Sequence, residues 1–123
     1  MAMNDPNRRR SKGGAKHKLA AVAVIAAVAL IIAGPLRAAI TTIDQKGQKF
    51  SITSVVIAVG DVIQYQNHDD VTHDIMVIDE QGEATDEGLQ RSGEIIAPEF
   101  DHPGTYQVRC SIHPRMKMTV VVR

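Results

Sequence analysis

Short apolar runs separated by polar turn residues make up most of the chain beyond Ala39. Residues 50–59 (FSITSVVIAV) are rich in β-branched side chains, which favour strands, and the following Gly60-Asp61 is typical of a turn. Residues 61–67 (DVIQYQN) then alternate apolar and polar side chains, as a strand with one buried face does. This part of the sequence has no apolar period of 3.6 residues, so no helix is predicted there.

The rest of this region continues the same pattern. Residues 71–78, 106–110 and 119–123 are predicted as strands, and Ile95-Ile96 is predicted to open another. Residues 79–94 (DEQGEATDEGLQRSGE) are acidic and contain glycine, so we expect them to form a surface loop. Several short strands joined by turns predict an all-β fold, either a sandwich or a barrel.

The beginning of the chain has a different character. Residues 1–38 carry a net charge of +6 and residues 39–123 a net charge of −6, so the sequence divides into two segments. A basic front precedes an apolar run at 19–34 (LAAVAVIAAVALIIAG) and a small-residue stretch, the order typical of an export signal. Extended to residues 19–36, the run approaches the roughly 20 residues that span a bilayer, so an uncleaved membrane anchor is the alternative. Both interpretations predict that residues 39–123 form one periplasmic domain.

The chemistry of the domain is concentrated near its end, in RCSIHPRMKMTVVVR. This stretch contains the only cysteine, Cys110, followed by His113, Met116 and Met118. Strand alternation places Cys110 and the more distant His73 on the core faces of two strands, at the points where loops begin. Two imidazoles, one thiolate and a weakly bound thioether are the ligands of a blue-copper site. The sequence therefore predicts one copper ion bound by His73, Cys110, His113 and Met116, with Met118 as the alternative thioether.

Two other chemistries would use the same side chains. A thiol nucleophile would pair Cys110 with His113 or His73 as its base, but the sequence offers no oxyanion site and no third orienting group. A structural zinc site prefers four cysteine or histidine ligands, often in paired C-x₂-C units, and this chain has a single cysteine. Taken one at a time, the cysteine and the methionines are most simply core residues and the histidine before proline a loop residue, but their clustering within seven positions favours copper.

The region from residue 50 to residue 123 resembles the cupredoxins, the type-1 blue copper proteins. The segment CSIHPRMKMTVVV is most similar to the ligand loop of amicyanins, and the Met118 spacing resembles plastocyanin and pseudoazurin. The segment FDHPGTYQVRC is similar to the family's approach to its copper-binding cysteine. In NHDDVTHDI an asparagine precedes a histidine by six positions, as in the family. The resemblance implies a Greek-key antiparallel β-sandwich or barrel with copper near one end.

The resemblance also implies roles for residues around the copper. Asn67 is expected to hydrogen-bond across to the ligand loop, at Ser111, and to hold the loop closed. Two positions depart from the amicyanin pattern. Ile112 stands where proline is common, and Arg115 stands where amicyanins have an aromatic residue. Because Arg115 would flank the exposed imidazole where partners dock, the amicyanin partner methylamine dehydrogenase is not the partner we expect.

These features predict an electron carrier. The protein is expected to cycle one electron between Cu(I) and Cu(II) as a monomer, without enzymatic activity. Its donor and acceptor would be redox proteins such as a dehydrogenase or a c-type cytochrome, with no nucleic-acid partner and membrane contact only through residues 1–38. Copper sequestration or delivery in the periplasm with the same ligands is the alternative. The acidic residues 79–94 are most simply a solvated face, or else they steer a basic cytochrome by long-range attraction.

Overall fold

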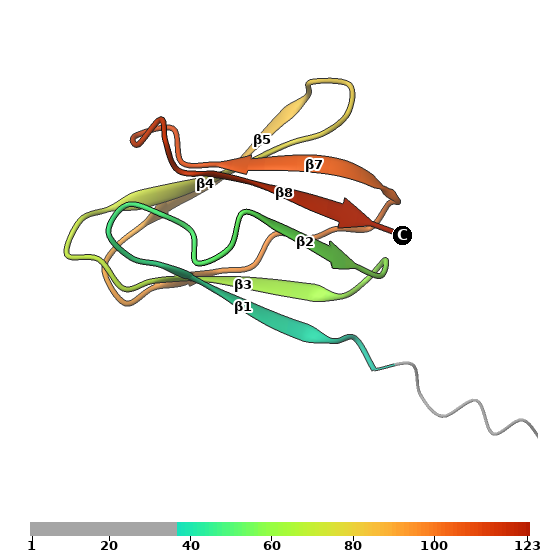
Figure 1. The fold of residues 1–123 in the computed structure, drawn as a ribbon, viewed down its shortest axis with the longest axis horizontal. Coiled ribbons are helices and arrows are strands. Elements are labelled where there is room, and N and C mark those ends of the chain that lie inside the picture. Colours follow the sequence, from blue (N-terminus) through green and yellow to red (C-terminus); the bar gives the residue numbers. More distant parts are fainter. Residues whose placement is uncertain (1–36) are drawn as a thin grey trace, which may run out of the picture. The chain divides into compact units, whose positions relative to one another are not determined.

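The computed structural model describes residues 37–123 (Figure 1). The predicted signal or anchor, with its apolar run at 19–36, lies outside the described residues. Within residues 37–123 we find no helix that is long and apolar enough to cross a membrane.

Eight strands build the described part of the chain, and the all-β prediction is confirmed. They are β1 (Ile40–Gln45), β2 (Ser54–Ile57), β3 (Val62–Asn67), β4 (His73–Ile78), β5 (Ala84–Gln90), β6 (Ile95–Ile96), β7 (Gly104–Arg109) and β8 (Lys117–Val122). One sheet has the order β1-β3-β6 and the other has the order β2-β8-β7-β4-β5. The two sheets face each other as the layers of a sandwich (Figure 1).

The sheets are mixed rather than purely antiparallel, which corrects one detail of the expected fold. β1 pairs with β3 in parallel, and β2 pairs with β8 in parallel. The remaining pairs, β3–β6, β4–β5, β4–β7 and β7–β8, are antiparallel. Because β2 belongs to the opposite sheet, the chain leaves the first sheet after β1 and re-enters it at β3 in the same direction. A connection of this kind allows parallel pairing, whereas a short hairpin would not.

The prediction of a loop at 79–94 is wrong for its middle part. Ala84–Gln90 form β5, which pairs with β4 at the edge of the five-stranded sheet. Only Gln90 of this strand is buried, and Leu89 is 69% exposed. An edge strand that buries one polar residue has no alternating apolar pattern, so its sequence resembles a loop. Similarly, β1 was not predicted, and the β-branched run at 50–59 contributes only the short β2.

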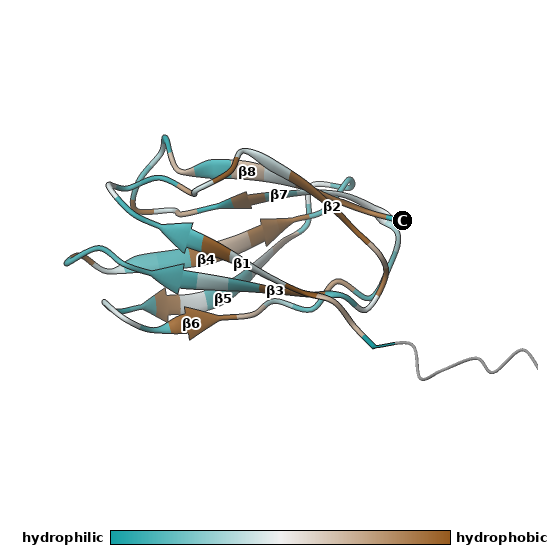
Figure 2. Cartoon of the chain, turned by 60° about the horizontal axis from the view of Figure 1, so that its bottom comes forward, coloured by the Kyte–Doolittle hydropathy of each residue, from teal (hydrophilic) through white to brown (hydrophobic). Residues whose placement is uncertain are grey.

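The core lies between the sheets, and its polar members gather at one end. Fourteen apolar side chains are buried: Ile43, Phe50, Ile57, Ile63, Tyr65, Ile75, Val77, Phe100, Val108, Cys110, Met116, Met118, Val120 and Val122. The buried polar side chains are Gln45, Asn67, His73, Asp74 and Gln90. They lie where β1, β3 and β5 end and β4 begins, on the left in Figure 2, where the ends of β1, β3 and β4 are coloured hydrophilic. We call this end of the sandwich the site end and the other the far end.

Candidate metal centre

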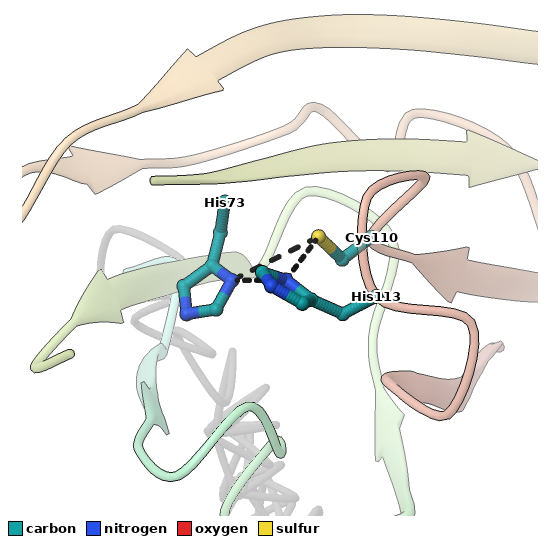
Figure 3. A group of neighbouring side chains, drawn as sticks. All are labelled: His73, Cys110 and His113. Carbon is teal, nitrogen blue, oxygen red and sulfur yellow. Dashed lines mark hydrogen bonds between the residues drawn. The ribbon is translucent and has the colours of Figure 1, made fainter. Parts of the chain in front are cut away.

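Two segments of the five-stranded sheet supply the candidate ligands. His73 is the first residue of β4, Cys110 directly follows β7, and His113 lies in the loop that leads to β8. The three side chains point toward one another at the site end (Figure 3). The loop is closed at its base by the pairing of Arg109 with Lys117, and one step further the Cys110 N–H donates to the Met116 carbonyl at 3.0 Å. The fold therefore brings together the predicted residues from positions far apart in the chain.

The ligand atoms form a compact triangle. Nδ1 of His73 lies 3.0 Å from Nδ1 of His113, and the Cys110 sulfur lies 3.8 Å from the first nitrogen and 3.4 Å from the second. The centre of a triangle with these sides is about 2 Å from each atom, which is the bond length of protein nitrogen and sulfur ligands to a transition metal. Two imidazole nitrogens and a sulfur facing one point are a donor set for a soft or borderline metal cation.

Asp69 determines which nitrogen of His73 faces the triangle. Nε2 of His73 lies 2.8 Å from a carboxylate oxygen of Asp69, and the imidazole is completely buried. Since a carboxylate only accepts hydrogen bonds, Nε2 carries the proton in the neutral ring and Nδ1 keeps a free lone pair. A carboxylate behind a ligating histidine in this manner orients the ring and increases its basicity.

The same carboxylate also holds the turn that follows β1. Asp69 accepts the backbone N–H groups of Gly47 at 2.6 Å and of Gln48 at 2.8 Å. Gln48 has φ of 55°, a left-handed conformation that costs a residue other than glycine about 1–2 kcal/mol and requires support from its surroundings. Burial raises the pKa of Asp69, but the hydrogen bonds from Gln48, His73 and Gly47 outweigh it, so its pKa lies below its usual value. Asp69 therefore links the candidate ligand His73 to the turn at 47–48.

The surroundings of the Cys110 thiol disfavour its ionisation in the absence of a metal. Burial raises the pKa of Cys110, and the N–H groups of Asp74, Ile112 and His113 offset only part of this effect. Without a cation the group therefore remains a thiol at neutral pH. A metal ligand must be a thiolate, so binding of a metal displaces the proton. The backbone N–H groups around the sulfur are then available to stabilise its negative charge.

The position of Met116 distinguishes it from Met118. Both side chains are buried, with 1% and 2% of their surfaces exposed. Met118 pairs with Val108 inside the β7–β8 ladder, and Met116 is opposite Cys110 where the ladder continues into the loop. Directly opposite residues on antiparallel strands project from the same face and are in contact distance. Met116 therefore lies beside the thiol, whereas Met118 is two pairs further along the ladder.

The expected contact between Asn67 and Ser111 is corrected by the structure. Asp74, the residue after His73, accepts the backbone N–H of Ser111 at 2.6 Å and also its hydroxyl. Asn67 instead donates to the carbonyls of Val71 at 2.8 Å and Gln90 at 3.1 Å. Strands β4 and β7 are neighbours in the five-stranded sheet, so Asp74 on β4 lies close to the loop that follows β7. Asn67 is on β3, which belongs to the other sheet. Asp74 thus takes the role expected of Asn67.

Gln90 is a further residue at the site end that the sequence did not indicate. It is fully buried and directly opposite His73 in the β4–β5 pair. Its side-chain amide donates to the carbonyls of Tyr65 and Glu94, both at 2.6 Å, and its oxygen accepts from Gln45. These bonds connect β5 to the three-stranded sheet behind the candidate ligands. No signal in the polar segment around Gln90 could have revealed this role.

Comparison with known proteins decides the family. A sequence profile described as copper binding proteins of the plastocyanin/azurin family matches residues 38–123. The chain belongs to this family. Among curated proteins, this cupredoxin is similar to Amicyanin-alpha of Methylorubrum extorquens, with 32% identity over 111 residues that cover 84% of this chain and 93% of the relative.

Solved structures share the cupredoxin fold. A methionine-to-alanine variant of amicyanin with Cu(I) has a TM-score of 0.62 at 21% identity, covering 68% of this chain and 81% of that chain. A purple cupredoxin of Nitrosopumilus maritimus has a TM-score of 0.59 at 24% identity, covering 68% and 99%. A copper-containing nitrite reductase of Thermus scotoductus SA-01 has a TM-score of 0.60 at 33% identity, covering 68% of this chain and 22% of that enzyme.

Family membership and the donor triangle together settle the cofactor class. Cupredoxins are copper proteins, and two imidazoles, one thiol and a neighbouring thioether fit a single type-1 copper ion. The resemblance to cupredoxins, the fold and the copper cofactor predicted from the sequence are therefore confirmed. Alternatives based on a thiol nucleophile or on structural zinc have no counterpart in these findings.

Proposed function

We propose that this cupredoxin is a periplasmic electron carrier in which His73, Cys110, His113 and Met116 hold one type-1 copper ion. The observation that carries the proposal is the convergence of two Nδ1 atoms and one sulfur within 3.8 Å of one another, from segments 37 residues apart. Copper, when bound, supplies a one-electron Cu(I)/Cu(II) couple. The protein's own contribution is to hold the ligands in one arrangement during the exchange.

Hydrogen bonds outside the ligand set provide this rigidity. Asp69 fixes the ring of His73, and Asp74 fixes the loop at Ser111 directly after Cys110. The Met116 N–H donates to the His113 carbonyl at 2.9 Å, which closes the loop on itself. Ligands that are already oriented need little rearrangement when their charge environment changes by one electron, because the cost of ordering them is met during folding.

His113 is the candidate route for electrons. Its side chain is half-buried, whereas His73, Cys110 and Met116 are almost completely buried. A partner that covers the loop would contact the outer edge of this imidazole and would approach the site more closely there than through the other three residues. We expect donor and acceptor to be redox proteins, such as a dehydrogenase and a c-type cytochrome, that meet a monomeric carrier in turn.

The periplasmic location rests on the leader. A basic front, an apolar run and the reversal of charge from +6 in residues 1–38 to −6 in residues 39–123 favour export, followed by cleavage or anchoring. Fusing residues 1–38 to a reporter enzyme that is active only outside the cytoplasm tests this directly. Reporter activity is expected, and a reporter that stays inactive although it is produced would exclude export.

A visible absorption spectrum of the copper-loaded chain tests the ligand assignment. The oxidised protein should be intensely coloured, because the Cys110 thiolate is coupled to copper, and reduction should bleach it. The variant Cys110→Ser should lose this absorption but keep the β-sheet circular dichroism of the native chain. Retained colour in the serine variant would contradict the assignment.

Copper storage or delivery is the competing role, and it makes a different prediction. Release to another protein is helped by exposed soft ligands, but Met116 and Met118 are both buried. We therefore expect the reduced protein to retain Cu(I) against a moderate chelator while it exchanges electrons rapidly and reversibly. Rapid loss of Cu(I) with slow electron exchange would favour the delivery role instead.

A further inference from the structure

A hollow opens beside the exposed edge of His113. It has a volume of about 400 Å³ and is lined by Gly47, Gln48, Lys49, His113, Pro114 and Arg115. The turn at 47–48 contributes one wall and is held in place by Asp69. Two cationic side chains, Lys49 and Arg115, therefore flank the imidazole from different loops, and no carboxylate belongs to the lining of this hollow.

A second pair of cations continues this surface along the base of the ligand loop. Arg109 and Lys117 are both exposed and lie directly opposite each other on β7 and β8. Like charges opposite each other on neighbouring strands are destabilising. Neither residue belongs to an ion pair within residues 37–123, and the same is true of Lys49 and Arg115. We call Lys49, Arg109, Arg115 and Lys117 the basic rim.

Carboxylates lie at both ends of the sandwich, but none of those in the described residues lines the hollow. Acidic side chains of the far end are Asp61, Asp79, Glu80, Glu83, Glu99 and Asp101, near the turns between β2 and β3, β4 and β5, and before β7. Figure 1 shows the β4–β5 turn at the opposite end from the loop between β7 and β8. At the site end, Asp44, Asp69 and Glu94 each face a cationic or imidazole partner, and Asp74 accepts hydrogen bonds from Ser111. Asp70 is the exposed carboxylate of this end that has no ion pair within residues 37–123. A domain with net charge −6 thus places four of its seven Lys and Arg side chains in the basic rim.

Apolar atoms lie at the centre of the basic rim. Ile112 is 49% exposed, and its neighbours His113 and Pro114 also reach the surface. Protein interfaces commonly have an apolar centre and a polar border, which is the arrangement of Ile112, His113 and Pro114 inside the basic rim. A small buried interface of this kind, supplemented by charge attraction, suits a partner that binds briefly and leaves.

We infer that the basic rim is the docking surface for an acidic redox protein, which binds over Ile112 and His113 with its carboxylates against Lys49, Arg109, Arg115 and Lys117. The inference rests on the proposed function, because it assigns a partner class to the same electron route. It also replaces the idea that residues 79–94 steer a basic cytochrome, since the acidic residues Asp79, Glu80 and Glu83 of this range lie at the far end and Glu94, at the site end, faces Arg91. A basic partner attracted there would be drawn away from His113.

The test compares two electron acceptors that differ in charge. The reduced, copper-loaded full chain is mixed with a basic cytochrome c, or with the same cytochrome after succinylation of its lysines, and haem reduction is followed by stopped flow. Electrostatic steering raises association rates by tenfold or more at low salt and fades with added salt. We expect the acidic cytochrome to be reduced about tenfold faster than the basic one at low ionic strength.

A pair of matched variants locates the effect. Residues 1–38 carry +6 in every variant, so a preference of the native chain alone would not identify the rim. Arg115→Glu, which changes the net charge by the same amount as the control Arg123→Glu, should remove most of the preference for the acidic cytochrome. Arg123→Glu, at the far end of β8, should preserve it. At high ionic strength the rates of the native chain and of all variants should converge, which excludes a changed reduction potential as the cause.

The outcomes separate this inference from the proposed function. Faster reduction of the basic cytochrome, or equal effects of the rim variant and of Arg123→Glu, would overturn the docking inference and leave the electron carrier intact. Failure to reduce either cytochrome by a chain that holds copper would instead overturn the proposed function, and the docking inference with it.

Discussion

The two ends of the sandwich are built on different principles. At the far end the strands bury aliphatic side chains such as Ile57, Ile63 and Val122. At the site end the five buried polar side chains of the described residues are gathered, and most of their polar atoms are paired with one another or with backbone groups. Burying apolar surface is non-directional and stabilises whatever shape is compact, whereas hydrogen bonds specify the direction of each group. The far end provides stability, and the site end provides orientation.

The first way to break this contrast is to damage the far end alone. Ile63 is fully buried in β3, and Ile63→Ala should lower the free energy of unfolding by about 2–5 kcal/mol, because it leaves a cavity in the core. The visible spectrum of the molecules that remain folded should not change. Chemical denaturation gives the first result and absorption the second, with Leu89→Ala, at an exposed position, as the control. Loss of colour in folded Ile63→Ala would show that the ends are not separable.

The opposite experiment damages the site end. Gln90→Leu keeps the side chain large but leaves the carbonyls of Tyr65 and Glu94 without their donor. Unpaired buried polar groups cost about 1–3 kcal/mol, so the stability loss should be similar to or smaller than that of the cavity. Here, however, copper affinity should fall as well, because Gln90 is opposite His73. Equilibrium competition with a chelator measures this change, and an unaltered affinity would mean that Gln90 has a purely structural role. Gln81→Leu, in an exposed turn, is the control.

Variants of the two methionines test which of these side chains belongs to the site and which belongs only to the core. Met116→Leu and Met118→Leu both preserve volume approximately, so each should cost less than about 1.5 kcal/mol of stability. If Met116 is the residue that would supply the weakly bound thioether, only its replacement should raise the reduction potential, by on the order of 60 mV, which corresponds to a tenfold change for one electron. Cyclic voltammetry of both variants decides the question. A raised potential in Met118→Leu alone would instead assign the thioether to Met118, so that the ligand segment would extend from Cys110 to Met118.

A smaller effect is expected from the charge of Asp74. Asp74→Asn can still accept the Ser111 N–H, so the loop should remain in place. A carboxylate near the site favours the more positive oxidised ion, and its replacement by a neutral amide should therefore raise the reduction potential by on the order of 40 mV. Asp101→Asn, at the far end, is the control for a general change in charge. Equal shifts in the two variants would show that Asp74 has no special position.

The smallest predicted effect concerns the turn before β3 at the far end. Hydrogen bonds from the N–H groups of Ala39 and Ala58 hold the pKa of Asp61 below its usual value. A lowered pKa in the folded chain stabilises it above the usual pKa of about 4, and this contribution is lost as pH falls through the folded value. Asp61→Asn should therefore be slightly less stable than the native chain at pH 7 and equally stable near pH 2. A difference that persists in acid would exclude this explanation.

The sequence predicted the site better than it predicted the sheets. Cys110, His113 and Met116 are close in the chain, and ligand chemistry restricts their spacing, so local sequence was sufficient to propose them as ligands. His73 followed from alternation along a single strand. The pairing of strands was less visible, because β5 presents a polar edge and the parallel pairs join segments that are distant in sequence.

Residues that act through hydrogen bonds were the hardest to assign. Asn67 and Asp74 are both polar, and both lie within six positions of His73 in the sequence. Which of them reaches Ser111 depends on sheet membership, a property of the whole fold. Gln90 is a similar case, because only pairing with β4 reveals its proximity to His73. Export, oligomeric state and the identity of the partners stay predictions.

The hairpin formed by β7 and β8 has a consequence for how such centres can change. Its ladder is continuous up to the pair of Arg109 and Lys117, and the segment beyond it contains most of the candidate donors. Residues 111–115 can therefore be exchanged, shortened or extended as a cassette, without altering the register of any strand. A scaffold with this property can acquire new redox potentials and new partners by local replacement, while its sheets retain the histidine that the cassette must meet.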